Sequence, residues 1–367
     1  MAKVITTELQ HSGASGANIT LDSSKNVTIE GNLTVDGTST LTGAVTGDNS
    51  GVENLFHNGE MLIDQRVGET SSYGHVADRW AHRTNTSSVL STTTSGVPAG
   101  FYKAASIVPA SGTHNIVFFQ GIELFPAGNP GQFTANTKWT ISIWSTAALN
   151  IEVGFNSGRG WGTNQAIQAS TAMTSTGNTS NTYTQYKHTI DIASVTPDAA
   201  NAALGVRFTT TSAVASVKFT GAQFESGENV SAFSHVPVSD ELKRCKRYFN
   251  ILANPASETY SDDKGRQTIA WGQVNNVSSK YVYFSDIFEV PMRAAPSIYK
   301  VVGTSYFRIM IPGGANTTSD FDVQGTWTNC WEVRCTAVDS FADDNKGNAV
   351  KLVCFNSAAR FGFTAEL

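Results

Sequence analysis

The first fifty residues repeat a short strand-like unit, and this repeat limits strongly what the chain can fold into. The units cover residues 19–21, 27–29 and 33–35, and a weaker unit follows at Leu41. Each of the first three places a threonine between two apolar residues, which is the alternation of a strand with one buried face. Strands this short cannot bury enough apolar surface to form a stable core within one chain. We therefore expect residues 1–51 to form an oligomerising stalk in which identical chains wrap together.

The composition favours an all-β fold with many turns. Only 15% of the 367 residues are charged, against about 25% in an average globular protein, so the long charged residues that build exposed helices are scarce. The net charge of −5 argues against a nucleic-acid partner. No apolar run approaches the ~18 residues that span a bilayer, and the start lacks the apolar core of a secretion signal. We expect synthesis in a cytoplasm and no membrane insertion.

The remaining sequence indicates two β-rich domains joined by a short helix. Residues 52–236 hold roughly eight strand-like segments with turn clusters between them, which is typical of a two-sheet jelly roll. Residues 237–250 have a helical pattern, with Ser239 as the expected N-cap and the side chains of Leu242, Cys245 and Phe249 on one face. Residues 251–367 return to the strand pattern, and their number predicts a C-terminal β-sandwich at the tip of the molecule.

The cysteines and the recognisable acidic motifs favour structural roles. Cys245, Cys330, Cys335 and Cys354 all lie in the last third, and no histidine lies near Cys330 or Cys335, so we expect free thiols, no metal site and no cofactor. Asp64, Arg66, Asp78 and Arg79 are expected to form buried ion pairs beside the first strand of the jelly roll. Trp80 is expected in the core rather than in a ligand site.

Several motifs in a fixed order resemble those of known proteins. They are NLFHNGEMLIDQR at residues 54–66, ADRW at 77–80, GAQFESG at 221–227, ELKRCKRYF at 241–249 and FEVPMRAAP at 288–296. The set resembles tail-fibre and other host-recognition proteins of tailed bacteriophages, and its opening looks like their carbohydrate-binding jelly roll. The resemblance implies a homotrimer in the virion tail that is attached to other tail proteins through the N-terminal stalk. It also implies that the distal domains bind a bacterial surface glycan.

Binding has more support in the sequence than catalysis. Glycoside hydrolysis needs two carboxylates about 5–9 Å apart. The candidate pairs are Asp262 with Asp263, Asp320 with Asp322, and Asp343 with Asp344. All of them lie in or beside Gly/Ser/Asn-rich loops, where acidic residues commonly cap turns or face solvent. No nucleophile elbow, zinc-binding HExxH helix or phosphate-binding loop occurs. We therefore expect no enzymatic activity and name no catalytic residue.

Aromatic residues in polar loops are the candidate glycan contacts, because aromatic faces stack on sugar C–H surfaces while amides and charged groups bond the hydroxyls. The first cluster comprises Arg159, Trp161 and Asn164; the second, in the last domain, comprises Tyr260, Asp322 and Trp327. Trp161 could instead contact a neighbouring subunit or fill a core. Trp327, Trp331 and Val333 could share one buried strand face, and Trp327 is the expected exception because it lies nearest the loop.

Three functions remain open at this stage. The favoured one is a phage tail fibre that adsorbs to host cells, with three chains per fibre converting weak sugar contacts into firm attachment. The alternatives are a purely structural tail adaptor or decoration protein and a surface-glycan depolymerase.

Overall fold

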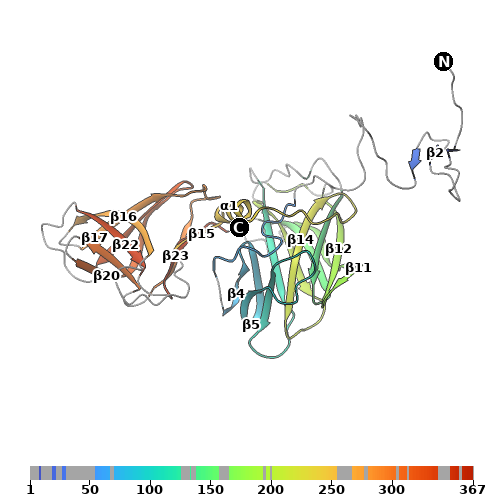
Figure 1. Cartoon of the computed structure of the whole chain (residues 1–367), viewed down its shortest axis with the longest axis horizontal. Helices are drawn as coiled ribbons and strands as arrows, with labels where there is room; N and C mark the ends of the chain where they lie inside the picture. Colours follow the sequence, from blue (N-terminus) through green and yellow to red (C-terminus); the bar gives the residue numbers. More distant parts are fainter. Residues whose placement is uncertain are drawn as a thin grey trace, which may run out of the picture. The chain divides into compact units, whose positions relative to one another are not determined.

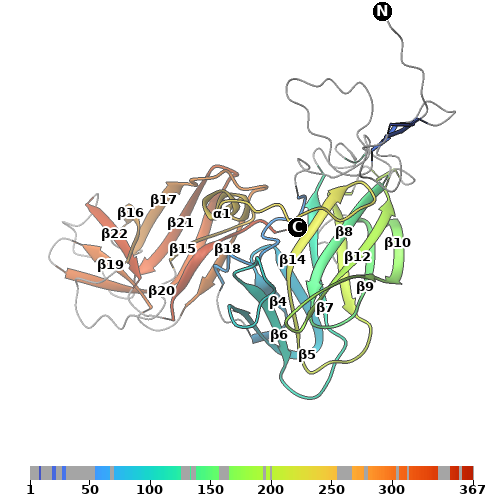
Figure 2. The same ribbon diagram turned by 45° about the vertical axis from the view of Figure 1, so that its right-hand side comes forward.

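The computed structural model of the chain describes most residues from 54 onward and three short strands before them. The described residues are 8–9, 19–21, 27–29, 54–66, 70–124, 133, 138–156, 165–192, 196–198, 201–253, 267–276, 280–302, 306–311, 314–337, 348–354 and 358–366. They divide between two compact units, Met1–Gly47 and Asp48–Leu367. Strands account for nearly all of the regular structure (Figures 1 and 2), which confirms the all-β prediction.

The first unit contains a small antiparallel sheet. Its strands β1 (Glu8–Leu9), β2 (Ile19–Leu21) and β3 (Val27–Ile29) are ordered β1-β2-β3. Ile19 lies opposite Ile29, and Leu21 lies opposite Val27, so the apolar positions of the repeat share a register. The two strands predicted at residues 19–21 and 27–29 are confirmed. The units predicted at residues 33–35 and at Leu41 lie outside the described residues.

The second unit begins with an eleven-stranded antiparallel sheet that folds over on itself. Its path runs β10-β9-β13-β7-β5-β6-β14-β8-β12-β11, and β4 pairs with β5 beside it. The long strand β5 joins the two layers, because Ala81–Arg83 pair with β7 whereas Ser88–Thr93 pair with β6. The strands are β4 (Thr70–Ala77), β5 (Trp80–Thr93), β6 (Ala104–Pro109), β7 (Val117–Glu123), β8 (Lys138–Ser145), β9 (Leu149–Asn156), β10 (Gln165–Ala172), β11 (Thr174–Ser180), β12 (Tyr183–Asp191), β13 (Ala203–Thr210) and β14 (Val217–Ser226).

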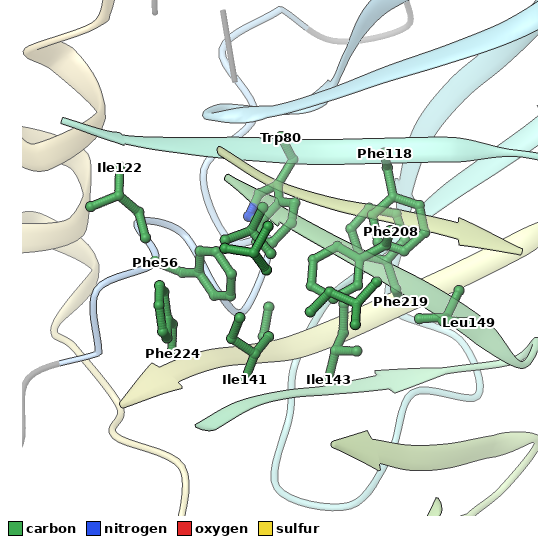
Figure 3. Packing of buried hydrophobic residues seen from close by; sticks show 14 of the residues in the cluster. Phe56, Trp80, Phe118, Ile122, Ile141, Ile143, Leu149, Phe208, Phe219 and Phe224 are labelled. Carbon is green, nitrogen blue, oxygen red and sulfur yellow. The ribbon is translucent and has the colours of Figure 1, made fainter. Parts of the chain in front are cut away.

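Aromatic and branched side chains fill the space between the two layers (Figure 3). Phe118 of β7 stacks on Phe219 of β14 with the ring centroids 3.9 Å apart, so the stack joins one layer to the other. Trp80 is fully buried beside them, and its indole N–H donates to the Asn58 carbonyl at 3.0 Å. Trp139, Ile141 and Ile143 are buried in the same core, as their alternation in the sequence predicts.

The predicted helix is present but is shorter and begins differently. Helix α1 spans Val238–Lys246, its N-cap is Pro237, and no side chain caps it; the prediction of Ser239 as N-cap is therefore wrong. Glu241 turns inward instead of facing solvent, and its Oε1 accepts a hydrogen bond of 2.7 Å from the backbone N–H of Asn58. Phe249 lies beyond the helix, where it begins strand β15 (Phe249–Ala253).

The C-terminal strands form a three-stranded sheet and a closed barrel. The sheet has the order β15-β23-β18, with β18 at Ser297–Val301 and β23 at Arg360–Thr364. The barrel runs β16-β17-β21-β20-β19-β22 and closes where β22 pairs with β16. Its strands are β16 (Gln267–Asn276), β17 (Tyr281–Ile287), β19 (Phe307–Ile311), β20 (Gly314–Thr326), β21 (Cys330–Ala337) and β22 (Ala349–Cys354).

One strand, β20, closes part of the predicted C-terminal β-sandwich into this barrel. The described β20 has thirteen residues, GANTTSDFDVQGT, with few apolar ones, so its sequence carries no strong strand signal. It pairs with β19 on one side and with β21 on the other. Without β20, strands β19 and β21 would each have an unpaired edge. Pairing with β20 closes the sheet and satisfies the backbone groups on both edges.

A buried ionic network ties residues 65–79 to the last described residue. Arg66 lies 3.6 Å from Asp78 and 3.1 Å from Glu366, and Arg79 also pairs with Glu366. The side chains of the two arginines are 4% and 3% exposed. Arg66 stacks over the Phe249 ring at 3.6 Å. The expected pairing of Arg66 with Asp78 is thus confirmed, and Glu366 is a partner that the sequence did not indicate.

The four cysteines are free thiols, as predicted. Three are buried and Cys330 is partly exposed. Within the described residues, no group of His, Cys, Asp and Glu side chains is arranged to hold a metal ion. The helix found there is also too short to cross a membrane.

Candidate functional site

The structure describes two of the six predicted ligand residues. Asp322 and Trp327 lie on the barrel, on β20 and in the turn that follows it. Arg159, Trp161, Asn164 and Tyr260 lie outside the described residues, as do the acid pairs at 262–263 and 343–344. The site is therefore built from the β20–β21 turn.

A tight turn holds the Trp327 side chain at the barrel surface. The backbone N–H of Trp327 donates to the carbonyl of Cys330 at 2.9 Å, so only three residues separate the two strands. Trp331 and Val333, which follow on β21, are 1% and 0% exposed, whereas Trp327 is 54% exposed. The strand alternation thus buries its odd-numbered residues, and Trp327 is the expected exception.

Gly325 supports the exposed indole ring. A Cβ at residue 325 would lie closer to Cη2 and Cζ3 of Trp327 than van der Waals contact allows. The six-membered part of the ring therefore rests against bare backbone, and any larger residue would lift it. The indole is 54% exposed in spite of this contact, so a large part of it is open to solvent. This geometry makes a flat aromatic surface for stacking.

Polar groups lie beside this ring on the same outer side of the barrel. Asp322 and Arg334 are cross-strand partners, and the Arg334 guanidinium donates to Oδ2 of Asp322 at 2.5 Å. This hydrogen bond is the main cause that raises the pKa of Arg334 above its usual value. Arg334 also lies over the Tyr281 ring, 4.4 Å from its centroid. Glu332 is the cross-strand partner of Gly325, so charged groups surround the aromatic surface.

The platform formed by Trp327, Gly325, Asp322 and Arg334 suits a ligand with both apolar and hydroxylated faces. The ring can stack on C–H groups, while the Asp322 carboxylate accepts and the Arg334 guanidinium donates hydrogen bonds. Sequence reasoning missed Gly325 and Arg334. The spacing Gly325-Thr-Trp327 is a usable signal for a supported ring, but the pairing of residues 322 and 334 depends on the strand register and a β-bulge between Val323 and Gly325.

A second exposed tryptophan on the barrel was also not predicted as a candidate. Trp271 of β16 is 67% exposed and lies opposite Lys351 of β22. Gly272, beside it in the chain, packs against the Tyr283 carbonyl and the Phe284 ring. Trp271 is a second exposed tryptophan on the same barrel, and it serves below as a control residue.

Comparisons with known proteins give only weak structural likenesses. No protein-family model matches the chain, and no curated protein matches it. One solved structure that matches is the enzymatically active domain of tailspike protein 4 of bacteriophage CBA120, with 14% identity and a TM-score of 0.28 over 47% of this chain and 21% of that one.

Two other solved structures that match come from xylanases. One is the CBM22-1–GH10 part of xylanase 10B from Clostridium thermocellum, with 9% identity, a TM-score of 0.26 and coverage of 47% of this chain and 30% of that one. The other is the CBM22-1–CBM22-2 tandem of Xyn10C from Paenibacillus barcinonensis, with 8% identity and a TM-score of 0.28 over 88% and 92%. The chain thus spans less than a third of two of these three structures. At TM-scores this low, none of them carries an argument about function.

Proposed function

We propose that this chain is a non-catalytic tail-fibre protein of a bacteriophage that recognises a glycan on the host surface. The proposal rests first on the ordered motifs at residues 54–80, 221–249 and 288–296, which resemble those of phage host-recognition proteins. The observation that carries it in the structure is the Trp327 ring laid on Gly325 beside the Asp322–Arg334 pair. An aromatic face with flanking hydrogen-bonding groups is the usual chemistry for holding a sugar ring.

Binding fits these residues better than hydrolysis does. A general acid in glycoside hydrolysis must hold a proton at working pH. The Asp322 carboxylate is instead engaged by a 2.5 Å hydrogen bond from the Arg334 guanidinium. In this role Asp322 is a fixed acceptor for sugar hydroxyls.

The wider setting of the proposal is a fibre of three identical chains in the virion tail. The stalk, residues 1–51, joins the chains to one another and to other tail proteins. A single exposed platform binds a sugar weakly, since few contacts are made. Three copies per fibre and several fibres per particle raise the overall attachment by orders of magnitude without new contacts.

The test is adsorption of fluorescently labelled full-length protein to a panel of bacterial strains, with Trp327→Ala and Gly325→Ala alongside. We expect saturable binding to particular strains, a loss of at least tenfold in affinity for Trp327→Ala, and a smaller loss for Gly325→Ala because the added Cβ lifts the ring. Trp271→Ala is the matched control, since it removes an exposed tryptophan from another strand of the same barrel; we expect it to bind as wild type does.

Four outcomes contradict the proposal. Equal losses for Trp271→Ala and Trp327→Ala would mean that exposed tryptophans adhere without specificity. Unchanged binding by Trp327→Ala would remove the platform from the function. Failure to bind any strain that the parent particle infects would favour a structural tail protein, and release of reducing ends from a bound glycan would favour a depolymerase.

A further inference from the structure

The jelly roll carries a groove that is separate from the Trp327 platform. Its floor comes from β8 and β12. Ile141 and Ile143 of β8 point into the core, so Ser142 and Trp144 face the opposite side of the sheet. Gln185 of β12 is the cross-strand partner of Trp144, and Lys187 is the partner of Ser142. Trp144, Gln185 and Lys187 line a hollow of about 640 Å³.

A β-bulge in β14 brings the aromatic part of the groove together. The register between β14 and β8 shifts between Thr220 and Gln223, and Gly221 in that bulge has φ +58°. A Cβ at residue 221 would lie 2.5 Å from Cζ of Phe101 and 2.8 Å from Cδ1 of Trp144. The absence of a side chain therefore lets both rings approach the strand. Gly221, the first residue of the motif GAQFESG, thus makes room for the aromatic side chains of the groove.

Two loops form the walls of the groove. The first, residues 97–101, is tied to the β11–β12 turn, because Asn181 donates to the Val97 carbonyl at 2.6 Å and the Ser180 hydroxyl accepts from the Ala99 N–H at 2.9 Å. This loop delivers Phe101, whose ring lies 6.5 Å from that of Trp144.

The second wall is the segment of residues 229–235. Ser231 is anchored to Glu225, whose Oε1 accepts from the Ser231 N–H at 3.0 Å, and the Ser234 N–H donates to Gln223 at 2.9 Å. The segment brings Phe233 against Phe101, 5.0 Å between centroids. Both walls are thus fixed by hydrogen bonds to the sheet, so the groove is formed before any ligand arrives.

The polar groups in the groove are donors rather than acids. Oε1 of Gln185 already accepts hydrogen bonds from Asn178 at 2.8 Å and from Thr176 at 3.1 Å, which points its amide N–H₂ toward the open side. Lys187 follows two residues later on the same face of β12 and makes no ion pair with the described residues. His235 at the edge is engaged by Glu60, 2.8 Å away. Among the described residues that line the groove, none is an aspartate or a glutamate.

We infer that this groove binds an acidic saccharide, with a sugar ring against Trp144 and its carboxylate held by Lys187 and the amide of Gln185. Gln185 lies directly opposite Trp144, about 5 Å away, and Lys187 is its diagonal neighbour on the same face, about 7–8 Å away and within reach of a long side chain. Charge-assisted bonds from an ammonium to a carboxylate are stronger than neutral ones. A protein partner is disfavoured, since interface centres are apolar and lack charged residues. The inference takes its ligand class, a saccharide, from the proposed function but uses a different site.

The test uses the full-length protein and hexuronate-containing capsular polysaccharides, each also prepared with its carboxyl groups reduced to alcohols. We expect binding to the acidic preparation and at least tenfold weaker binding to the reduced one. Lys187→Gln is expected to weaken binding of the acidic form by about tenfold and to leave binding of the reduced form unchanged, whereas Lys187→Arg restores most of it. Trp144→Ala lowers binding of both forms. Lys351→Gln on the barrel is the matched control, and circular dichroism checks the fold of each variant.

Equal binding of the acidic and reduced preparations would overturn the inference, as would unchanged binding of the acidic form by Lys187→Gln. Loss of binding by Lys351→Gln to the same extent would assign the effect to general charge and would also overturn it. None of these polysaccharide results contradicts the proposed function, provided that the Trp327→Ala variant loses adsorption in the separate test with cells. Conversely, a protein that binds no strain but binds the acidic polysaccharide through Lys187 would contradict the proposed function and support the groove.

Discussion

Gly221 affects both the backbone conformation and the side-chain packing at its position. It combines a left-handed backbone, φ +58°, with two aromatic rings that lie where a Cβ would be. The left-handed region costs other residues about 1–2 kcal/mol, and overpacking costs about 1–3 kcal/mol more. Gly96 has a similar backbone, φ +66°, but nothing lies within 4 Å of its would-be Cβ. The two glycines therefore separate the backbone cost from the packing cost.

We predict that Gly221→Ala lowers the free energy of unfolding by about 2–5 kcal/mol, whereas Gly96→Ala lowers it by about 1–2 kcal/mol. Urea unfolding followed by tryptophan fluorescence measures both. Equal losses for the two variants would show that the rings of Phe101 and Trp144 do not press on residue 221.

At the scale of elements, the buried ionic network makes a sharper prediction than any surface pair. Burial by itself would raise the pKa of Glu366, but the charge of Arg79, together with the charge and hydrogen bond of Arg66, outweighs this effect and lowers it to about 2. Glu366→Gln would leave two buried arginines with one negative partner fewer, and breaking a buried pair in this way costs about 3–5 kcal/mol.

We therefore expect Glu366→Gln to lower the free energy of unfolding by about 3–5 kcal/mol. The matched control is Asp191→Asn, which removes the partner of Lys138 in a pair whose two side chains are 47% and 41% exposed. Surface pairs of this kind contribute less than about 1 kcal/mol. Comparable losses in the two variants, measured by the same urea unfolding, would refute a special role for the network.

Sequence reasoning succeeded for strands with a clear apolar alternation and failed for the others. The sequence pattern predicts strands at residues 149–155, 183–192 and 203–209, and the structure has them at Leu149–Asn156, Tyr183–Asp191 and Ala203–Thr210. The first and the last of these have one wholly apolar or nearly apolar face. β11 was missed because its sequence, TSTGNTS, has no apolar residue. This strand forms because its backbone pairs with that of β12. The residues of β11 alone do not indicate this pairing.

The same distinction applies to the candidate sites. Trp327 was predictable, because its odd spacing with Trp331 and its place beside a loop could be read along the chain. Trp144 was assigned to a strand whose alternation points it outward, but alternation cannot say whether an outward face is flat or hollow. That depends on loops 97–101 and 229–235, which lie more than 40 residues away in either direction.

At the scale of the whole molecule, buried histidines make stability depend on pH. Burial is the main cause that lowers the pKa of His57 and of His75 to about 3 and of His82 to about 4. The unfolded chain protonates all three near pH 6.5, while the folded chain keeps them neutral. Burial also raises the pKa of Asp78 to about 6, against the opposing charge of Arg66, so below pH 6 the folded chain gains one proton there. The unfolded chain thus binds about two more protons, and stability falls as the pH falls.

We predict that the free energy of unfolding falls by about 2.7 kcal/mol per pH unit between pH 6 and pH 4.5. Below about pH 4.5 the loss steepens, because Glu366 is then protonated in the unfolded chain but not in the folded one. Urea midpoints at intervals of half a pH unit measure the slope. His82→Gln is expected to reduce it by about 1.4 kcal/mol per pH unit, and a slope that does not change in this variant would rule out a neutral buried His82.

The stalk provides the prediction that belongs to the assembly. Strands β1, β2 and β3 have two or three residues each, and a sheet of this size is not stable alone in water. If partner chains complete it, the full-length protein sediments as a trimer and residues 48–367, which form their own compact unit, sediment as a monomer. Analytical ultracentrifugation distinguishes these masses, since one chain has 39.2 kDa. A trimeric 48–367 fragment would place the contacts outside the stalk, and a monomeric full-length protein would exclude a trimeric fibre.

The double variant Ile19→Ser, Leu21→Ser tests the same assembly without removing any residue. It takes the apolar side chains from β2 at the two positions that face Ile29 and Val27 in the register, and we expect it to be monomeric. Its affinity for a soluble glycan should equal that of wild type, because the sites at Trp327 and Trp144 are untouched. Its attachment to cells should fall by about a hundredfold or more, since linked sites lose that much avidity when they are separated. Unchanged attachment by a monomeric variant would show that one chain suffices for adsorption.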